Sequence, residues 1–108
     1  MVENLNRFDI VLVKLNPTVG SEIQKTRPCI VISPNEMKAL KTVIVAPMTS
    51  KGFSFVFRPH IYFENKDGLV LLDQIRAVDK TRLVKKIGKV DIETSKEIAD
   101  TLEEMFRY

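Results

Sequence analysis

The side chains best suited to chemistry lie in a polar segment near the N-terminus, from Asn16 to Pro28. It holds one carboxylate, Glu22, and one guanidinium, Arg27, between two runs rich in β-branched residues. A guanidinium stays charged at any working pH and can donate two hydrogen bonds to phosphate oxygens, while a carboxylate can accept a proton. Asn, Pro, Gly and Ser are typical of loops, and loops held by strands often carry catalytic groups. The same composition also fits a plain connection between strands.

A hydroxyl group follows another strongly apolar run. Thr49 comes directly after Ala46-Pro47-Met48, where a strand would end. Its hydroxyl could donate to a phosphate or relay a proton, although a threonine at a strand end is usually only a turn residue. Arg27 precedes Pro28, which restricts the arginine backbone to an extended conformation and helps to fix the direction of its side chain.

Apolar runs predict the strands that position these groups. We expect strands over residues 8–15, 29–32 and 42–48, the third of them central because it is apolar on both alternating faces. Residues 53–63 predict a half-buried strand at a sheet edge or bulge, since Pro59 lacks an amide donor. A turn at 66–68 should connect it to a strand over 69–78, forming a hairpin, and 86–90 should form a short strand.

Helical signals are fewer. Ser33-Pro34-Asn35-Glu36 predicts one helical turn capped by Ser33, and residues 79–83 predict another. A capping box of Thr94 and Glu97 with apolar residues at helical spacing predicts an amphipathic helix from Thr94 to Arg107. Mostly β structure with a terminal helix is typical of a small, twisted antiparallel sheet or open barrel.

Length and composition indicate one packed domain over residues 1–108, with 44% hydrophobic and 29% charged residues. No signal peptide or membrane span is recognisable, which predicts a cytoplasmic protein that makes no membrane contact. One cysteine, Cys29, and one histidine, His60, give no intramolecular disulfide and no zinc motif, so we expect neither a metal nor another cofactor. Residues 76–89 contain six basic residues against one acid, a run that either attracts phosphate or is simply solvated.

Three separated blocks resemble the MazF/PemK family of toxin endoribonucleases. The most specific block is Gly20-Ser21-Glu22 followed by Thr26-Arg27-Pro28, and the other blocks are residues 44–50 and 72–76. The resemblance extends from about Phe8 to the C-terminal helix. It implies a mainly β (α+β) fold, an SH3-like small barrel of twisted antiparallel strands with short helices and a C-terminal α-helix, usually assembled as a homodimer.

The resemblance also implies an activity: sequence-specific, metal-independent cleavage of single-stranded RNA by attack of the ribose 2′-hydroxyl. It marks Arg27 and Thr49 as the catalytic pair, with Glu22 close by. Glu22 is a candidate proton acceptor, or it orients Arg27 through an ion pair, and both roles stay open. The candidates for RNA contact are Ser21, Gln24, Lys25, Ser50 and Gln74.

The chain departs from the family pattern at several positions. One branch of the family has a histidine in the first loop and an arginine two residues before Asp73, where this chain has Ser21 and Leu71, which makes Asp73 a poor candidate for the base. Phe8 stands where the family usually has glycine. We interpret His60, outside every block, as a surface residue and Cys29 as a core residue.

The partners that the resemblance implies are single-stranded RNA and a cognate antitoxin. The antitoxin is expected to be an acidic, partly disordered peptide laid over the basic RNA groove, and DNA would be contacted only through it. A different class remains as an alternative: a non-enzymatic toxin or binding module that uses the same barrel against a protein such as a topoisomerase. Such a binder has no need of Glu22, Arg27 and Thr49 together. A third reading is an RNA-binding module that has lost activity.

Overall fold

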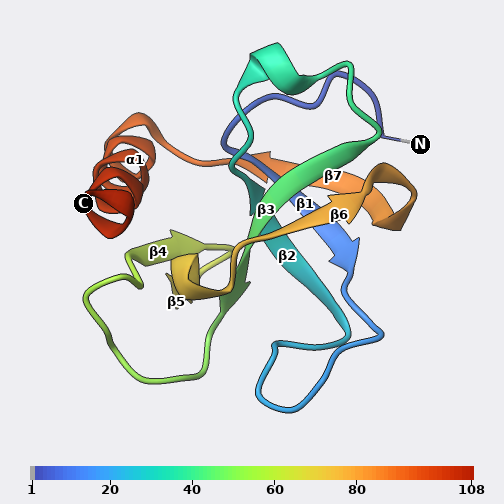
Figure 1. Ribbon diagram of the computed structural model, residues 1–108. Helices are drawn as coiled ribbons and strands as arrows, with labels where there is room; N and C mark the ends of the chain where they lie inside the picture. Colours follow the sequence, from blue (N-terminus) through green and yellow to red (C-terminus); the bar gives the residue numbers. More distant parts are fainter. Residues whose placement is uncertain (1) are drawn as a thin grey trace.

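In a computed structural model, which describes residues 2–108, an antiparallel sheet curls on itself and a single long helix follows it (Figure 1). Its strands are β1 (Asp9–Lys14), β2 (Thr26–Val31), β3 (Thr42–Thr49), β4 (His60–Phe63), β5 (Lys66–Val70), β6 (Arg76–Asp79) and β7 (Leu83–Lys89). The helical elements are the short 3₁₀ turns η1 (Asn35–Met37), η2 (Leu72–Gln74) and η3 (Lys80–Arg82), and the helix α1 (Ile92–Phe106). The predicted fold, a twisted antiparallel sheet with a C-terminal helix, is confirmed.

The central strand is β3, as its two apolar faces predict. It pairs with β2 on one side and with both β5 and β6 on the other, in the order β4-β5-β3-β2-β1-β7. Val43 and Val45 pack into one buried cluster, and Ile44 and Ala46 pack into the other. A strand that is covered on both faces must be apolar at successive positions, which explains the run from Val43 to Met48.

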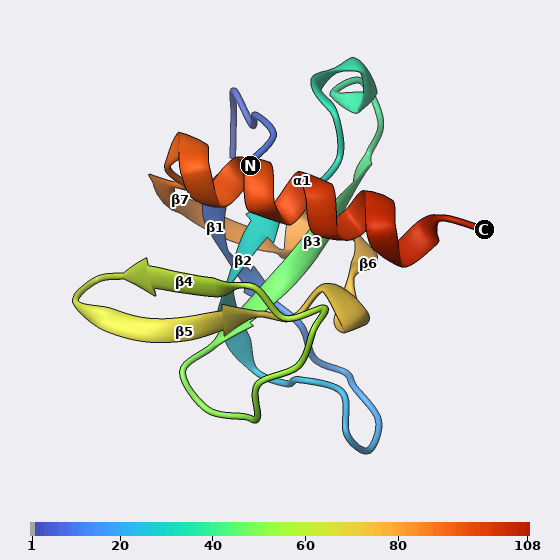
Figure 2. The ribbon, with the colours of Figure 1, turned by 90° about the vertical axis from the view of Figure 1, so that its left-hand side faces the viewer.

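Helix α1 covers one face of the sheet, across which it lies in Figure 2. Its buried side chains Ile98 and Leu102 join the cluster that contains Ile10, Ile30 and Val70. Burying each such side chain contributes roughly 1.5–3 kcal/mol to stability. The helix begins before the predicted residue: Asp91 is the N-cap and its side chain accepts from the backbone N–H of Thr94, so the predicted capping box is wrong while the helix itself is confirmed.

The predicted cap at Ser33 is also wrong. Its Oγ accepts a hydrogen bond of 2.6 Å from the backbone N–H of Ile44, and η1 forms without a side-chain cap. Ser33 thereby joins the chain before η1 to β3. Predicted turns at both η1 and η3 are present, and at η3 the side chain of Asp79 caps the N–H of Thr81.

The long strand predicted over residues 53–63 is wrong in its first half. Only His60–Phe63 form a strand, β4, which lies at the sheet edge as Pro59 suggested. Phe53, Phe55 and Val56 are exposed on a loop between β3 and β4. The alternating aromatic residues that suggested a half-buried strand therefore belong to a loop.

The hairpin between β4 and β5 is confirmed, but its turn is not at 66–68. Glu64 and Asn65 occupy the turn with φ of 50° and 62°, the left-handed conformation that two-residue hairpin loops require. Gly68 lies within β5, where a Cβ would come 2.9 Å from the carbonyl oxygen of Thr49. That glycine is therefore needed for close strand approach. The strand predicted over 69–78 is interrupted by η2, so β5 and β6 pair with different halves of β3.

Candidate active site

Strands β2 and β3 bring Arg27 and Thr49 together. Strand β2 starts at Thr26, earlier than the predicted strand, because Val13 and Lys14 of β1 pair with Arg27 and Thr26. On the other side Cys29 pairs with Pro47, and the same antiparallel register continued by two residues sets Arg27 opposite Thr49. Arg27 thus stands on a strand rather than in the loop where the sequence placed it.

Both residues line a hollow of about 330 Å³, which we call the arginine hollow. Ser50 lines it as well, so three predicted site residues meet here. The remaining wall comes from Pro28 and Met48 and from the β4–β5 hairpin: Ile61, Phe63, Glu64, Lys66, Asp67 and Gly68. Lys66, Asp67 and Gly68 were not predicted as site residues because their composition suggested a turn. The sequence did contain a signal for them: the predicted hairpin had to pair with another strand, which could have placed its residues beside the site.

The guanidinium of Arg27 is hydrogen-bonded within the protein through only one of its three nitrogens, among the residues that the structure describes. Its Nε donates a 3.0 Å hydrogen bond to the main-chain oxygen of Gln24. Within residues 2–108 the ion pairs join other side chains, and none includes Arg27. Its two terminal nitrogens are therefore available to a ligand, and two parallel N–H donors suit a phosphate group.

Thr49 presents a hydroxyl whose hydrogen can be given to a ligand. The Oγ1 atom accepts a 3.1 Å hydrogen bond from the N–H of Lys51, which uses an oxygen lone pair and leaves the O–H as a donor. Its backbone is fixed by pairing with Leu69 of β5.

Glu22 lines a separate hollow of about 400 Å³, which we call the glutamate hollow, together with Ile23, Asp73, Gln74, Ile75 and Arg76. Its Oε1 accepts a 2.7 Å hydrogen bond from the N–H of Val19 within its own loop. An ion pair with Arg27, one of the two roles left open for Glu22, does not form among the described residues. Gln74 lies beside it and accepts a 2.8 Å hydrogen bond from the N–H of Ile23, which ties η2 to the first loop.

The other predicted RNA contacts lie along the first loop. Ser21, Gln24 and Lys25 are exposed. Lys25 has a φ of 71°, and its N–H donates to the side-chain oxygen of Asn16, so the loop closes on its own polar groups. Figures 1 and 2 both show this loop and the β3–β4 loop projecting from the same end of the molecule.

Asp73 is committed to an ion pair. Both its oxygens accept from Arg58, Oδ1 from Nε at 3.0 Å and Oδ2 from Nη2 at 2.9 Å. These hydrogen bonds lower the pKa of Asp73 below its ordinary value, against a smaller opposing effect of burial. A carboxylate with a lowered pKa is a weaker base, which agrees with the sequence analysis.

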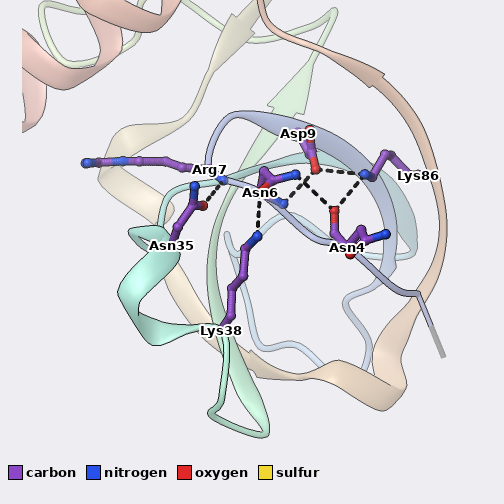
Figure 3. A network of polar contacts seen from close by, with 7 residues as sticks. All are labelled: Asn4, Asn6, Arg7, Asp9, Asn35, Lys38 and Lys86. Atoms are coloured by element: carbon purple, nitrogen blue, oxygen red, sulfur yellow. Dashed lines mark hydrogen bonds and ion pairs between the residues drawn. The ribbon is translucent and has the colours of Figure 1, made fainter.

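Much of the basic run over residues 76–89 holds the fold together. Arg76, Lys80 and Arg82 donate to main-chain oxygens, and Lys86 binds the buried carboxylate of Asp9 at 3.1 Å. Figure 3 shows Lys86 also reaching Asn4 and shows the neighbouring contact of Lys38 with Asn6, in a network that fastens the N-terminal segment to β7 and η1. Four of the six basic side chains of this run therefore have bonding partners within the fold.

The two residues set aside by the sequence analysis lie as it predicted. Burial raises the pKa of the Cys29 thiol to about 12, although the charge of Arg76 opposes the effect. Cys29 is part of the core on the inner face of β2. His60 is exposed on β4. In residues 2–108 no cluster of histidine, cysteine or carboxylate side chains could hold a metal ion, and no helix is long and apolar enough to cross a membrane.

Residues 6–106 match the family model described as the PemK-like, MazF-like toxin of type II toxin-antitoxin systems. The chain belongs to this toxin family. A relative named endoribonuclease MazF, from Staphylococcus saprophyticus, is 32% identical over 106 residues, covering 92% of this chain and 88% of its own length. The family predicted from the three sequence blocks is thus confirmed.

Solved structures agree with the MazF-like fold. The crystal structure of MazF from Deinococcus radiodurans has a TM-score of 0.81 at 21% identity, with 94% of each chain covered. An endoribonuclease from a mycobacterial species, solved in complex with its cognate antitoxin, has a TM-score of 0.79 at 17% identity and covers 96% of this chain and 98% of its own. The curled sheet with a C-terminal helix is therefore the fold of MazF-like toxins.

Proposed function

We propose that this toxin is an endoribonuclease that cuts single-stranded RNA, including mRNA, at a specific sequence. The observation that carries the proposal is that Arg27 and Thr49, from the paired strands β2 and β3, line one hollow. A guanidinium and a hydroxyl that line the same hollow are the donors that a pentacoordinate phosphorane needs. Family membership and the 32% identical relative named endoribonuclease support the same activity.

The proposed reaction needs no metal. The ribose 2′-oxygen forms a bond to phosphorus and the bond from phosphorus to the 5′-oxygen breaks, which gives a 2′,3′-cyclic phosphate and a 5′-hydroxyl. Arg27 neutralises the extra charge on the phosphorane, and the hydroxyl of Thr49 donates to it or passes a proton to the leaving oxygen.

Glu22 is the proposed acceptor of the 2′-hydroxyl proton. Because its carboxylate lines the glutamate hollow, RNA must draw the first loop toward Arg27 before Glu22 can act. Catalytic contacts often tighten only when substrate is bound. Asp67 is the rival acceptor, since it already lines the arginine hollow. The roles of Glu22 and Asp67 can therefore be compared directly by substituting each carboxylate.

RNA specificity is proposed to come from the residues around the two hollows. Ser50 stands beside Thr49, Gln74 borders the glutamate hollow, and Ser21, Gln24 and Lys25 lie along the loop that projects at the same end. A small site of this kind must reach unpaired bases and an unconstrained 2′-hydroxyl, which an RNA duplex hides.

The proposed partners follow from the family. We propose that a cognate antitoxin, acidic and partly disordered, neutralises the toxin, as the mycobacterial structural neighbour is found with its own antitoxin. We further propose a homodimer, a cytoplasmic location, and DNA contact only through the antitoxin. Sedimentation of the purified toxin with and without antitoxin measures both associations.

Cleavage of a long RNA in the presence of EDTA tests the proposal. We expect cuts at a recurring short sequence, with cyclic phosphate and 5′-hydroxyl ends, and loss of these cuts in Arg27→Ala. Arg107→Ala, an arginine at the exposed end of α1, is the matched control and should cut like the parent. Intact RNA with inhibited DNA supercoiling would support the non-enzymatic toxin instead. Binding of RNA without cyclic-phosphate product would indicate a module that has lost activity.

A further inference from the structure

In the β3–β4 loop, the aromatic ring of Phe53 lies against the charged guanidinium of Arg58. The guanidinium carbon of Arg58 lies 4.7 Å from the centre of the Phe53 ring. Arg58 is itself held by the two hydrogen bonds to Asp73 and is only 12% exposed at its side chain. Its Nη1 also reaches the carbonyl oxygen of Phe53 at 3.4 Å. One side of the Phe53 ring is thus held by a half-buried arginine, while Phe53 itself is still 69% exposed.

This ring lies close to the proposed chemistry. Gly52, with a φ of 118°, brings the loop tightly past Thr49: a Cβ there would lie 3.8 Å from Cγ2 of Thr49 and 3.7 Å from Nη1 of Arg58. Thr49 lines the arginine hollow and Asp73 lines the glutamate hollow. Gly52 is thus a near neighbour of both Thr49 and Arg58, and Arg58 binds Asp73, so the loop that carries Phe53 adjoins residues of both hollows.

We infer that Phe53 is a base-stacking residue for the RNA, with Arg58 and Asp73 as its positioning residues. The inference rests on the proposed function. An exposed aromatic ring stacks on a nucleobase, and a ring already held on a guanidinium loses little freedom when the base arrives. The stacked base belongs to a nucleotide near the cut, because Phe53 directly follows Gly52, which lies beside Thr49.

The neighbouring aromatic residues do not have this arrangement. Phe55 packs edge to face with Phe57, their ring centres 5.9 Å apart, and within residues 2–108 no cation lies over the Phe55 ring. Phe55 is therefore the matched control: the same residue type, in the same loop, and also exposed.

The experiment uses the RNA cut site mapped for the parent. An oligonucleotide with a 2′-deoxyribose at the attacked position measures binding without cleavage, and its versions with one base removed on either side of the cut locate the stacked base. Stacking of one base is worth about 5- to 150-fold in affinity. We expect Phe53→Ala to weaken Kd by that factor and raise KM similarly with kcat little changed, Phe53→Trp to restore both, and Phe55→Ala to change neither.

A double-mutant cycle separates stacking from loop damage. Removal of the stacked base should weaken binding to the parent and have no further effect on Phe53→Ala. Arg58→Gln should raise KM in the parent but not in the Phe53→Ala background, because Arg58 acts through the ring. An unchanged Kd in Phe53→Ala, or equal losses in Phe55→Ala, overturns the inference while leaving RNA cleavage intact. Absence of RNA cleavage by the parent instead overturns the proposed function.

Discussion

The arginine hollow and the glutamate hollow divide the predicted site between two kinds of chemistry. The first offers a cation and a hydroxyl on paired strands, and the second offers a carboxylate and an amide that hold a loop. The proposed phosphate-binding groups thus sit on paired strands, whereas the proposed proton acceptor sits on a loop outside the sheet. Under the proposed mechanism, phosphate binding would be built into the sheet, whereas proton transfer would depend on the position of the first loop.

Arg27→Ala should have the largest effect. Removing a donor that faces the developing charge lowers kcat by about 10²–10³-fold. Initial rates on a short RNA containing the mapped site measure it. Thr49→Val should also lower kcat, and the double variant should lose less than the product of both losses, because the two side chains act on one phosphate. Fully multiplicative losses would show that Arg27 and Thr49 act at separate places.

A comparison of the cleavage rates of Glu22→Gln and Asp67→Asn decides which hollow supplies the proton acceptor. We expect Glu22→Gln to lower kcat by about 100-fold, since an amide cannot take the proton. Glutamine keeps an oxygen for the N–H of Val19, so the loop should stay folded. Asp67→Asn should cleave like the parent. The reverse result would place the acceptor in the arginine hollow and make loop movement unnecessary.

Gln74 fastens the first loop to η2 within the glutamate hollow, and its loss should have a smaller effect. Gln74→Leu removes the acceptor for the N–H of Ile23, which leaves the first loop less ordered. An interaction of this kind is worth about 1 kcal/mol, or roughly fivefold in KM. Gln74→Glu keeps the accepting oxygen and serves as the control for loop order in amide hydrogen exchange. If both variants raise KM equally while Ile23 stays protected in Gln74→Glu, the amide group reads RNA directly.

The parts that local pattern determines were predictable. Helix α1 was predicted because burial of one face spaces its apolar residues at the helical period. Strand β3 was predicted because burial of both faces gives an unbroken apolar run. Residues 26–28 were assigned to a loop because they are polar and include Pro28, yet they pair with β1 and form part of β2. Their strand character comes from a partner distant in sequence, which no short window reveals.

The division of the site was beyond sequence reasoning for the same reason. Glu22 and Arg27 are five residues apart and were grouped as one loop, but β2 starts between them and separates their side chains. Asp67 was overlooked because the glycine beside it suggested a turn. Gly68 is needed instead for the close approach of Thr49, a contact between strands that forms only in the folded chain.

The ion pair between Arg58 and Asp73 should give the smallest effect, and one that depends on pH. Hydrogen bonds from Arg58 lower the pKa of Asp73, so this stabilisation is present above the unfolded value of about 3.9 and is lost as pH falls through the lower folded value. Asp73→Asn should reduce the free energy of unfolding by about 1 kcal/mol at pH 7, and the difference should shrink below about pH 4.

Urea unfolding at pH 7 and at pH 3 measures this difference. The control is Glu104→Gln, which removes an exposed ion pair with Arg107 and should change stability little at either pH. A loss in Asp73→Asn that is the same at both pH values would mean that shape, not charge, holds Arg58 in place. A loss confined to neutral pH would instead tie the order of the β3–β4 loop to the ionised carboxylate at the edge of the glutamate hollow, so that acid should loosen Phe53 before it unfolds the sheet.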